Sequence, residues 1–147
     1  MFGFFKKKAP VQQASSDSKA QGMVSIASRL LATQFMMGSV DDERIASYLS
    51  RDFFALGYVF GLADHAAFQV AEPTPSQEQS VAFIRAVFCG MTTKEQADDL
   101  LTVALSLQQD PDFSQGRDMG ASELGDWVKT QGQRVPMSLA AHLSGKG

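Results

Sequence analysis

From residue 23 onward, apolar positions recur every three or four residues, which is the spacing of one face of a helix. No stretch of convincing length alternates apolar and polar residues as a half-buried strand would. The pattern therefore predicts an all-α fold. We expect a single-domain bundle of about five or six mostly antiparallel helices, because short connections favour antiparallel neighbours.

Capping signals divide this pattern into helices. We expect the second helix to begin at Ser39, where SVDD resembles a capping box, and to run unbroken to about Val70. The boxes TPSQ and TTKE predict the next two starts at Thr74 and Thr92. The remaining expectations are a first helix over 23–37, a polar loop over 110–118, a fifth helix over about 119–131 and a sixth from Pro136.

The most apolar stretch is FFALGYVFGLADH, residues 53–65. Eleven uncharged residues lie between Asp52 and Asp64, whereas a membrane span needs about 20 apolar residues. The stretch therefore predicts a buried helix. Because its apolar side chains point to all sides of the axis, it is either the central helix of the bundle or a helix covered by another subunit. The candidates for packing or partner contact are Phe54, Gly57, Tyr58, Gly61, Leu62 and His65.

Gly57 and Gly61 lie four residues apart and so share one helix face. Each glycine costs about 1 kcal/mol in a helix interior relative to alanine, so a close contact should offset that cost. The expected contact is another helix of the same fold. The alternative is a flat ligand on the glycine face, in a pocket near His65.

Few residues have the spacing that catalysis or metal binding requires. Asp64 and His65 are adjacent, so they point about 100° apart and do not jointly hold one ion. The single cysteine, Cys89, excludes an internal disulfide. In the stretch that begins with DPDFSQGRD, Gln115 and Ala121 stand where a calcium loop needs its defining glycine and glutamate. We therefore expect no catalytic residue, metal or cofactor, although enzyme activity stays open.

Charge is unevenly distributed along the chain. Residues 1–22 carry a net charge of +3 and the remainder a net charge of −6. An acidic body disfavours binding to a phosphate backbone, so we expect no nucleic-acid partner. Residues 9–22 have little hydrophobic content. These features predict a disordered tail and linker over 1–22 and a helical domain over 23–147.

The chain begins with MFGFFKKKAP, in which aromatic residues precede lysines. This order does not fit a secretory signal, so we expect a cytoplasmic protein. The aromatic rings would enter a lipid interface while the lysines lie over anionic headgroups, each lysine contributing about 1 kcal/mol. The alternative is a terminus without a special role. The candidates for this weak tag at the inner membrane face are Phe2, Phe4, Phe5, Lys6, Lys7 and Lys8.

These patterns favour a non-enzymatic helical module that binds another protein or itself, for example as a homodimer. The seven methionines suit adaptable binding surfaces. Two alternatives remain open. One is a small-molecule-binding protein or enzyme with an inter-helix pocket near Gly57, Gly61 and His65. The other is a peripheral membrane adaptor that uses residues 2–8.

Overall fold

The computed structural model describes residues 2–71 and 74–146, with the side chains of residues 2–17 and 146 outside the description. Within that part every regular element is a helix, so the predicted all-α class is confirmed. Seven α-helices and one 3-10 turn are present there, more helices than the sequence predicts. They are α1 (Phe2–Met37), η1 (Asp42–Arg44), α2 (Ile45–Leu49), α3 (Phe53–Val70), α4 (Gln77–Met91), α5 (Lys94–Ser106), α6 (Pro111–Lys129) and α7 (Ser138–Lys146).

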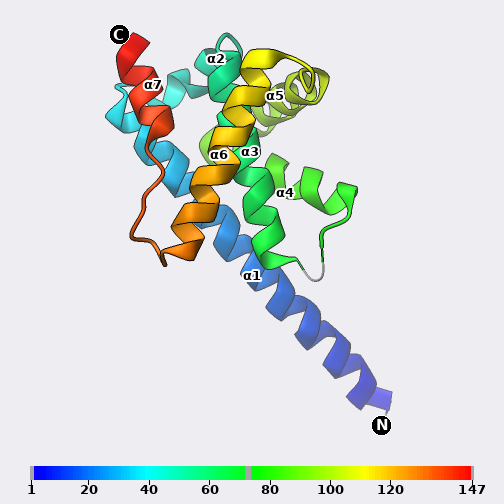
Figure 1. Ribbon diagram of the computed structural model, residues 1–147. Coiled ribbons are helices and arrows are strands. Elements are labelled where there is room, and N and C mark those ends of the chain that lie inside the picture. Colours follow the sequence, from blue (N-terminus) through cyan, green and yellow to red (C-terminus); the bar gives the residue numbers. More distant parts are fainter. Residues whose placement is uncertain (1, 72–73, 147) are drawn as a thin grey trace.

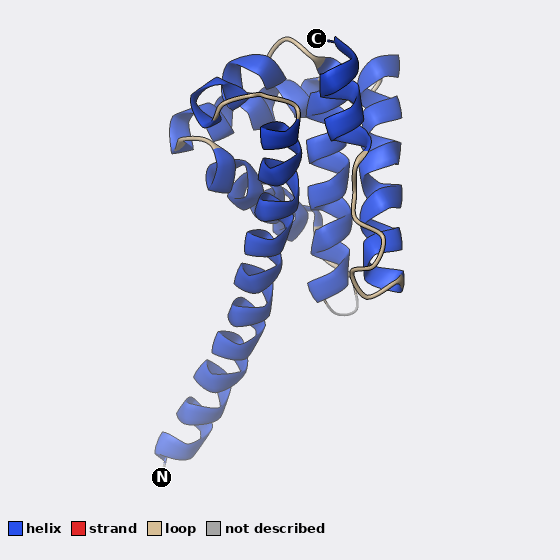
Figure 2. Cartoon of the chain, turned by 90° about the vertical axis from the view of Figure 1, so that its left-hand side faces the viewer, coloured by secondary structure: helices blue, strands red, loops and turns tan. Residues whose placement is uncertain are grey.

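The helices pack around α3, and the amino-terminal half of α1 projects from the body (Figure 1). α3 and α6 lie side by side, and α7 packs against α1 (Figure 2). α4 contacts α1, α3 and α5. By its backbone α1 begins at Phe2. The division into a disordered tail over 1–22 and a helical domain over 23–147, and the antiparallel order of neighbours, stay predictions.

The expected unbroken helix from Ser39 to Val70 is wrong, because Asp52 starts a new helix. The Asp52 side chain accepts a hydrogen bond from the Ala55 N–H at 3.0 Å and so caps α3. Ser39 has a φ of 63°, which is not the extended backbone of an N-cap. The SVDD segment therefore forms no capping box, and η1 and the short α2 precede α3.

α4 begins later than TPSQ predicts. Its N-cap is Ser76 instead of Thr74. The Ser76 hydroxyl accepts a hydrogen bond from the Gln79 N–H, and the Gln79 side chain accepts one from the Ser76 N–H. Both pairs, Thr74 with Gln77 and Ser76 with Gln79, have the spacing of a capping box, so the pattern alone does not choose between them.

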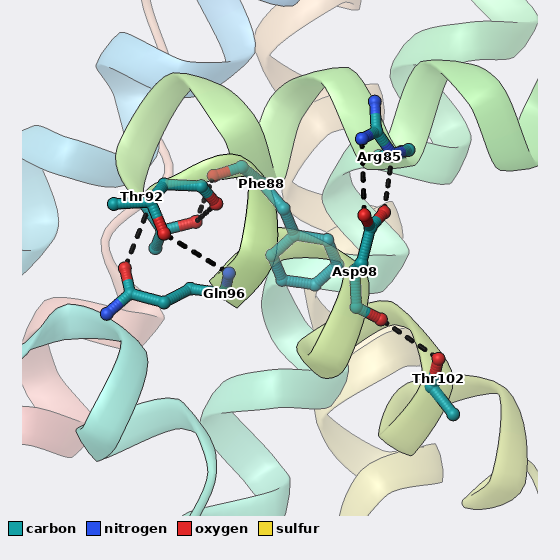
Figure 3. Close-up of polar contacts among 7 residues, drawn as sticks. Arg85, Phe88, Thr92, Gln96, Asp98 and Thr102 are labelled. Carbon is teal, nitrogen blue, oxygen red and sulfur yellow. Dashed lines mark hydrogen bonds and ion pairs between the residues drawn. The ribbon is translucent and has the colours of Figure 1, made fainter.

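The corner between α4 and α5 shows why α5 also begins later than predicted (Figure 3). The Thr92 hydroxyl donates to a carbonyl of the last turn of α4 at 2.7 Å, so Thr92 ends that helix. Thr93 then caps α5 in a box with Gln96. Arg85 and Asp98 join the two helices at 2.6 Å, but both side chains are well exposed and such pairs contribute little stability.

Residues 110–118, predicted as a polar loop, form the first half of α6. Asp110 caps the helix by accepting a hydrogen bond from the N–H three residues later, at 3.0 Å. Pro111 takes the first turn, where its missing N–H has no cost. The glycines Gly116 and Gly120 obscure this helix in the sequence, because glycine usually signals a turn.

α3 and α6 approach each other through glycines on both helices. A Cβ on Gly57 or Gly61 would lie 2.1 or 2.0 Å from a backbone carbonyl oxygen of α6. A Cβ on Gly116 or Gly120 would lie 2.0 or 2.2 Å from a carbonyl oxygen of α3. None of these positions has room for a side chain. The prediction that another helix of the same fold covers the Gly57–Gly61 face is confirmed.

α3 is the central apolar helix of the described structure. Every residue from Ala55 to Ala63 is buried. By length and composition alone, α3 is also the one described helix that would suffice to cross a membrane, but 61% of it is buried inside the protein. That burial is typical of a core helix, as the sequence predicts for residues 53–65.

We expect Gly61→Ala to destabilise the protein by roughly 1–3 kcal/mol or more, because overpacking a closely packed contact typically costs that much. Its Cβ would meet the carbonyl oxygen of Arg117. Gly22→Ala is the matched control, since nothing lies within 4 Å of its Cβ, and alanine there gains up to about 1 kcal/mol. Urea unfolding followed by circular dichroism measures both. Equal stability of the two variants would contradict the close contact.

Candidate functional site

The predicted candidates on α3 mostly face inward. Tyr58 and Leu62 have no exposed surface, and Gly57 and Gly61 lie directly under the backbone of α6. A flat ligand on the glycine face is therefore excluded, because α6 fills that space. Tyr58 and Leu62 likewise offer no surface to a partner, since they pack within their own chain.

Tyr58 lies in a polar cluster where α1, α3, α6 and α7 meet. Its hydroxyl donates to Glu123 Oε1 at 2.5 Å and accepts a hydrogen bond from Gln34 Nε2 at 3.2 Å. Burial, together with the hydrogen bond to Glu123, raises the pKa of Tyr58 well above its usual range. The hydroxyl therefore stays protonated and acts as a structural donor. We call Gln34, Tyr58, Glu123 and Ser138 the Tyr58 cluster.

The Tyr58 cluster caps the amino-terminus of α7. Glu123 Oε1 accepts hydrogen bonds from the N–H groups of Met137 at 3.2 Å and Ser138 at 3.0 Å, and Oε2 accepts one from the Ser138 hydroxyl. Gln34 Oε1 accepts a hydrogen bond from the Ala140 N–H at 3.0 Å. These N–H groups have no partner within a helix, and a carboxylate also matches the positive end of the helix dipole.

A second polar cluster holds α7 near the start of α3. His142 Nε2 lies 2.8 Å from Asp52 Oδ2, and the Tyr48 hydroxyl donates to the same oxygen at 2.9 Å. The ring of Phe54 stacks at a tilt on His142, with 4.5 Å between centroids. We call these four residues the Asp52 cluster. It accounts for the half-buried Phe54 and gives α7 its second attachment to the body.

The environment of the Asp52 cluster shifts two of its pKa values. Burial alone would raise the pKa of Asp52, but hydrogen bonds from the Ala55 N–H, His142 and Tyr48 outweigh burial and lower it. Burial and the hydrogen bond to Asp52 raise the pKa of Tyr48 to about 12. A carboxylate beside a histidine also occurs in catalytic triads. Within the described chain, however, no serine, threonine or cysteine hydrogen-bonds to His142.

The remaining candidates occupy packing positions. His65 is half-buried and turns its Nε2 toward α6, at 3.3 Å from the position of a Cβ on Gly125. Burial raises the pKa of Asp64, and the nearby charges of His65 and Arg117 partly offset that effect. Cys89 is half-buried. In the described residues no three His, Cys, Asp or Glu side chains gather around a point that would hold a metal.

A surface hollow lies between α1, the end of α3 and α4. We call it the α1–α4 groove. It has a volume of about 770 Å³ and is lined by residues between 19 and 25, 67 and 71, and 75 and 86. Its lining is mainly small and apolar, and Lys19 is the single charged side chain among the described residues that line it. Its size is within the usual range for a ligand site.

A smaller hollow lies at the carboxyl-terminal end of α1. Its volume is about 460 Å³, and it is lined by Met36 and Val40 together with the acidic residues Asp41, Asp42 and Glu43. Met36 is 70% exposed, the most of any large hydrophobic side chain in the described part. We call this feature the Met36 hollow.

Sequence reasoning named Tyr58 and Phe54 but missed their polar partners in the two clusters and the residues that line both hollows. A signal existed for the Tyr58 cluster, since Gln34 interrupts the inward stripe of the first helix and is 1% exposed. Glu123 lies three residues after Gly120, on the face of α6 that meets α3. The side chains of the membrane-tag candidates lie outside the described residues; they are Phe2, Phe4, Phe5, Lys6, Lys7 and Lys8.

Comparisons with protein-family models, curated proteins and solved structures found no match. The site is therefore interpreted from its own geometry.

We expect Asp52→Asn to destabilise the protein at pH 7, by an amount that shrinks as the pH falls below about 4. The folded-state pKa of Asp52 is below its unfolded value. The carboxylate therefore stabilises the fold above the unfolded pKa, and that stabilisation is lost as the pH falls through the folded pKa. Urea unfolding from about pH 2 to 7 measures the difference, with the exposed Asp99→Asn as control. A difference in unfolding free energy between wild type and Asp52→Asn that does not change with pH would contradict the lowered pKa of Asp52.

Proposed function

We propose that the protein is a non-enzymatic helical interaction module of the cytoplasm that binds a second copy of itself, or another protein, through the Met36 hollow. The supporting observation is the exposure of Met36, 70%, and of its neighbour Met37, 49%. Large apolar side chains that remain in water beside a hollow mark an interaction surface. Methionine suits this role because its flexible thioether adapts to different partners.

Charge selects the kind of partner for this surface. Asp41, Asp42 and Glu43 line the hollow and are exposed, so a complementary segment carries basic and apolar side chains together. The chain itself has such a segment at 2–8, which contains three phenylalanines and three lysines. At 1.5 Å per residue, α1 separates that segment from its own hollow by roughly 40 Å. A segment bound in the hollow would therefore come from a second copy, and reciprocal exchange gives a closed dimer.

The polar clusters support the non-enzymatic part of the proposal. The acid–base groups of the Tyr58 cluster and the Asp52 cluster hydrogen-bond one another and the backbone of α7. No buried side-chain nitrogen or oxygen in the described part lacks a partner. A small-molecule site at Gly57, Gly61 and His65 is not proposed, because the backbone of α6 occupies the space beside these residues.

We expect the full chain to form a dimer that Met36→Lys weakens at least tenfold. The lysine removes apolar surface and repels a basic segment, yet it suits the carboxyl-terminal end of a helix. Deleting residues 2–8 should have the same effect, and high salt should weaken the wild-type dimer. Size-exclusion chromatography with light scattering measures the mass over a concentration series.

Met119→Lys is the matched control, since Met119 is 38% exposed on α6, away from the hollow. A wild-type chain that stays monomeric would overturn self-association. A dimer that survives both Met36→Lys and the deletion would overturn this surface.

The same basic-aromatic segment supports a second candidate function, weak contact with an anionic membrane at its inner face. We expect deletion of residues 2–8 to weaken the affinity for phosphatidylglycerol-containing vesicles roughly 100-fold, since each lysine contributes about 1 kcal/mol. Sedimentation with the vesicles measures this affinity. Neutral phosphatidylcholine vesicles are the control lipid. Met36→Lys should not weaken vesicle binding, because it leaves the segment intact and frees it from the dimer; this separates the membrane role from dimerisation. Equal vesicle binding with and without the segment would eliminate the membrane role.

A further inference from the structure

The α1–α4 groove combines apolar side chains, among them Phe83, with small side chains. Phe83 of α4 lies at its base and is 8% exposed, and Val24 and Val70 are partly buried beside it. Alanines from all three helices form much of the remaining lining. Small side chains leave space between the helices, so the groove can accept an apolar body.

The charge of the groove is one-sided. Lys19 contributes a cation from α1, and the remaining polar groups of the described lining are the neutral side chains Gln21, Ser25 and Gln79. Pro75 and Gln79 place the amino-terminal end of α4 at the groove, where a helix dipole also favours an anion. Glu78 lies in the same turn of α4 but is exposed and does not line the groove.

We propose that the α1–α4 groove binds a free long-chain carboxylate, with its hydrocarbon chain over Phe83 and its carboxylate paired with Lys19. The apolar lining suits a hydrocarbon chain, and Lys19, the cation among the described lining residues, suits a single anionic end. A protonated amine of the same length lacks that pairing, and an alcohol lacks its charge. This site is separate from the Met36 hollow, so the proposal does not depend on the proposed self-association.

The test uses the full chain and isothermal titration calorimetry with laurate below its micelle concentration. Laurate should bind with a stoichiometry of one, and decanoate, two methylenes shorter, should bind roughly tenfold more weakly. Dodecylamine and dodecanol should each bind at least tenfold more weakly than laurate. Lys19→Glu should weaken laurate at least tenfold and strengthen dodecylamine. Ala86→Phe, which fills the groove, should abolish binding of both.

Lys94→Glu is the matched charge control, because Lys94 is exposed on α5 and does not line the groove. Thermal unfolding of each variant verifies the fold, and if Ala86→Phe fails to fold, the exposed Lys19→Glu still decides. Absence of laurate binding, equal binding of dodecylamine, or a loss in Lys94→Glu as large as in Lys19→Glu would overturn the proposal. Binding only to laurate-containing vesicles, lost in Lys19→Glu, would assign the groove to a membrane surface and likewise overturn it.

Discussion

The fold depends on one contact, the backbone-to-backbone approach of α3 and α6. Four glycines remove every side chain from the line where the helices meet, so carbonyl oxygens of each helix lie against the α-carbons of the other. Such closeness brings many weak dispersion contacts and Cα–H···O interactions, which must offset the glycines' lower helix propensity. It also sets the depth at which Tyr58 lies. Gly120 and Glu123 share a face of α6. The Glu123 carboxylate therefore lies within hydrogen-bond distance of the Tyr58 hydroxyl.

The same contact explains how a nine-residue helix stays docked at the end of the chain. A helix this short is unstable in isolation, so its stability comes from tertiary contacts. Glu123 and Gln34 satisfy the free N–H groups at its start. His142 binds Asp52 one turn later, and Leu139 and Leu143 join the core. The residue that caps α3 is therefore also an attachment point of α7, and the two helices are linked through one carboxylate.

The sequence predicts the part of this arrangement that rests on periodicity. The paired glycines of residues 53–65 indicated a close helix, and the apolar residues around the axis indicated a central one. The identity of that neighbouring helix was missed, because residues 110–118, which include Gly116, resemble a loop. Pairing of small residues between two distant segments is a tertiary property, and no single stretch of sequence shows it. The capping boxes placed the starts of two helices slightly too early, since overlapping candidates satisfy the same spacing. The Tyr58 cluster was missed because its members lie up to 104 positions apart (Gln34 to Ser138).

The four glycines also determine where the molecule can move. Two helices in backbone contact have a fixed register, because a slide of one residue would drive the large side chains of one helix into the carbonyls of the other. The α3–α6 pair is therefore the rigid part of the molecule, and rearrangement is confined to the helices around it. Both surface hollows border α1, which belongs to that outer set. A ligand or partner in either hollow would therefore change the position of α1 relative to the rigid α3–α6 pair.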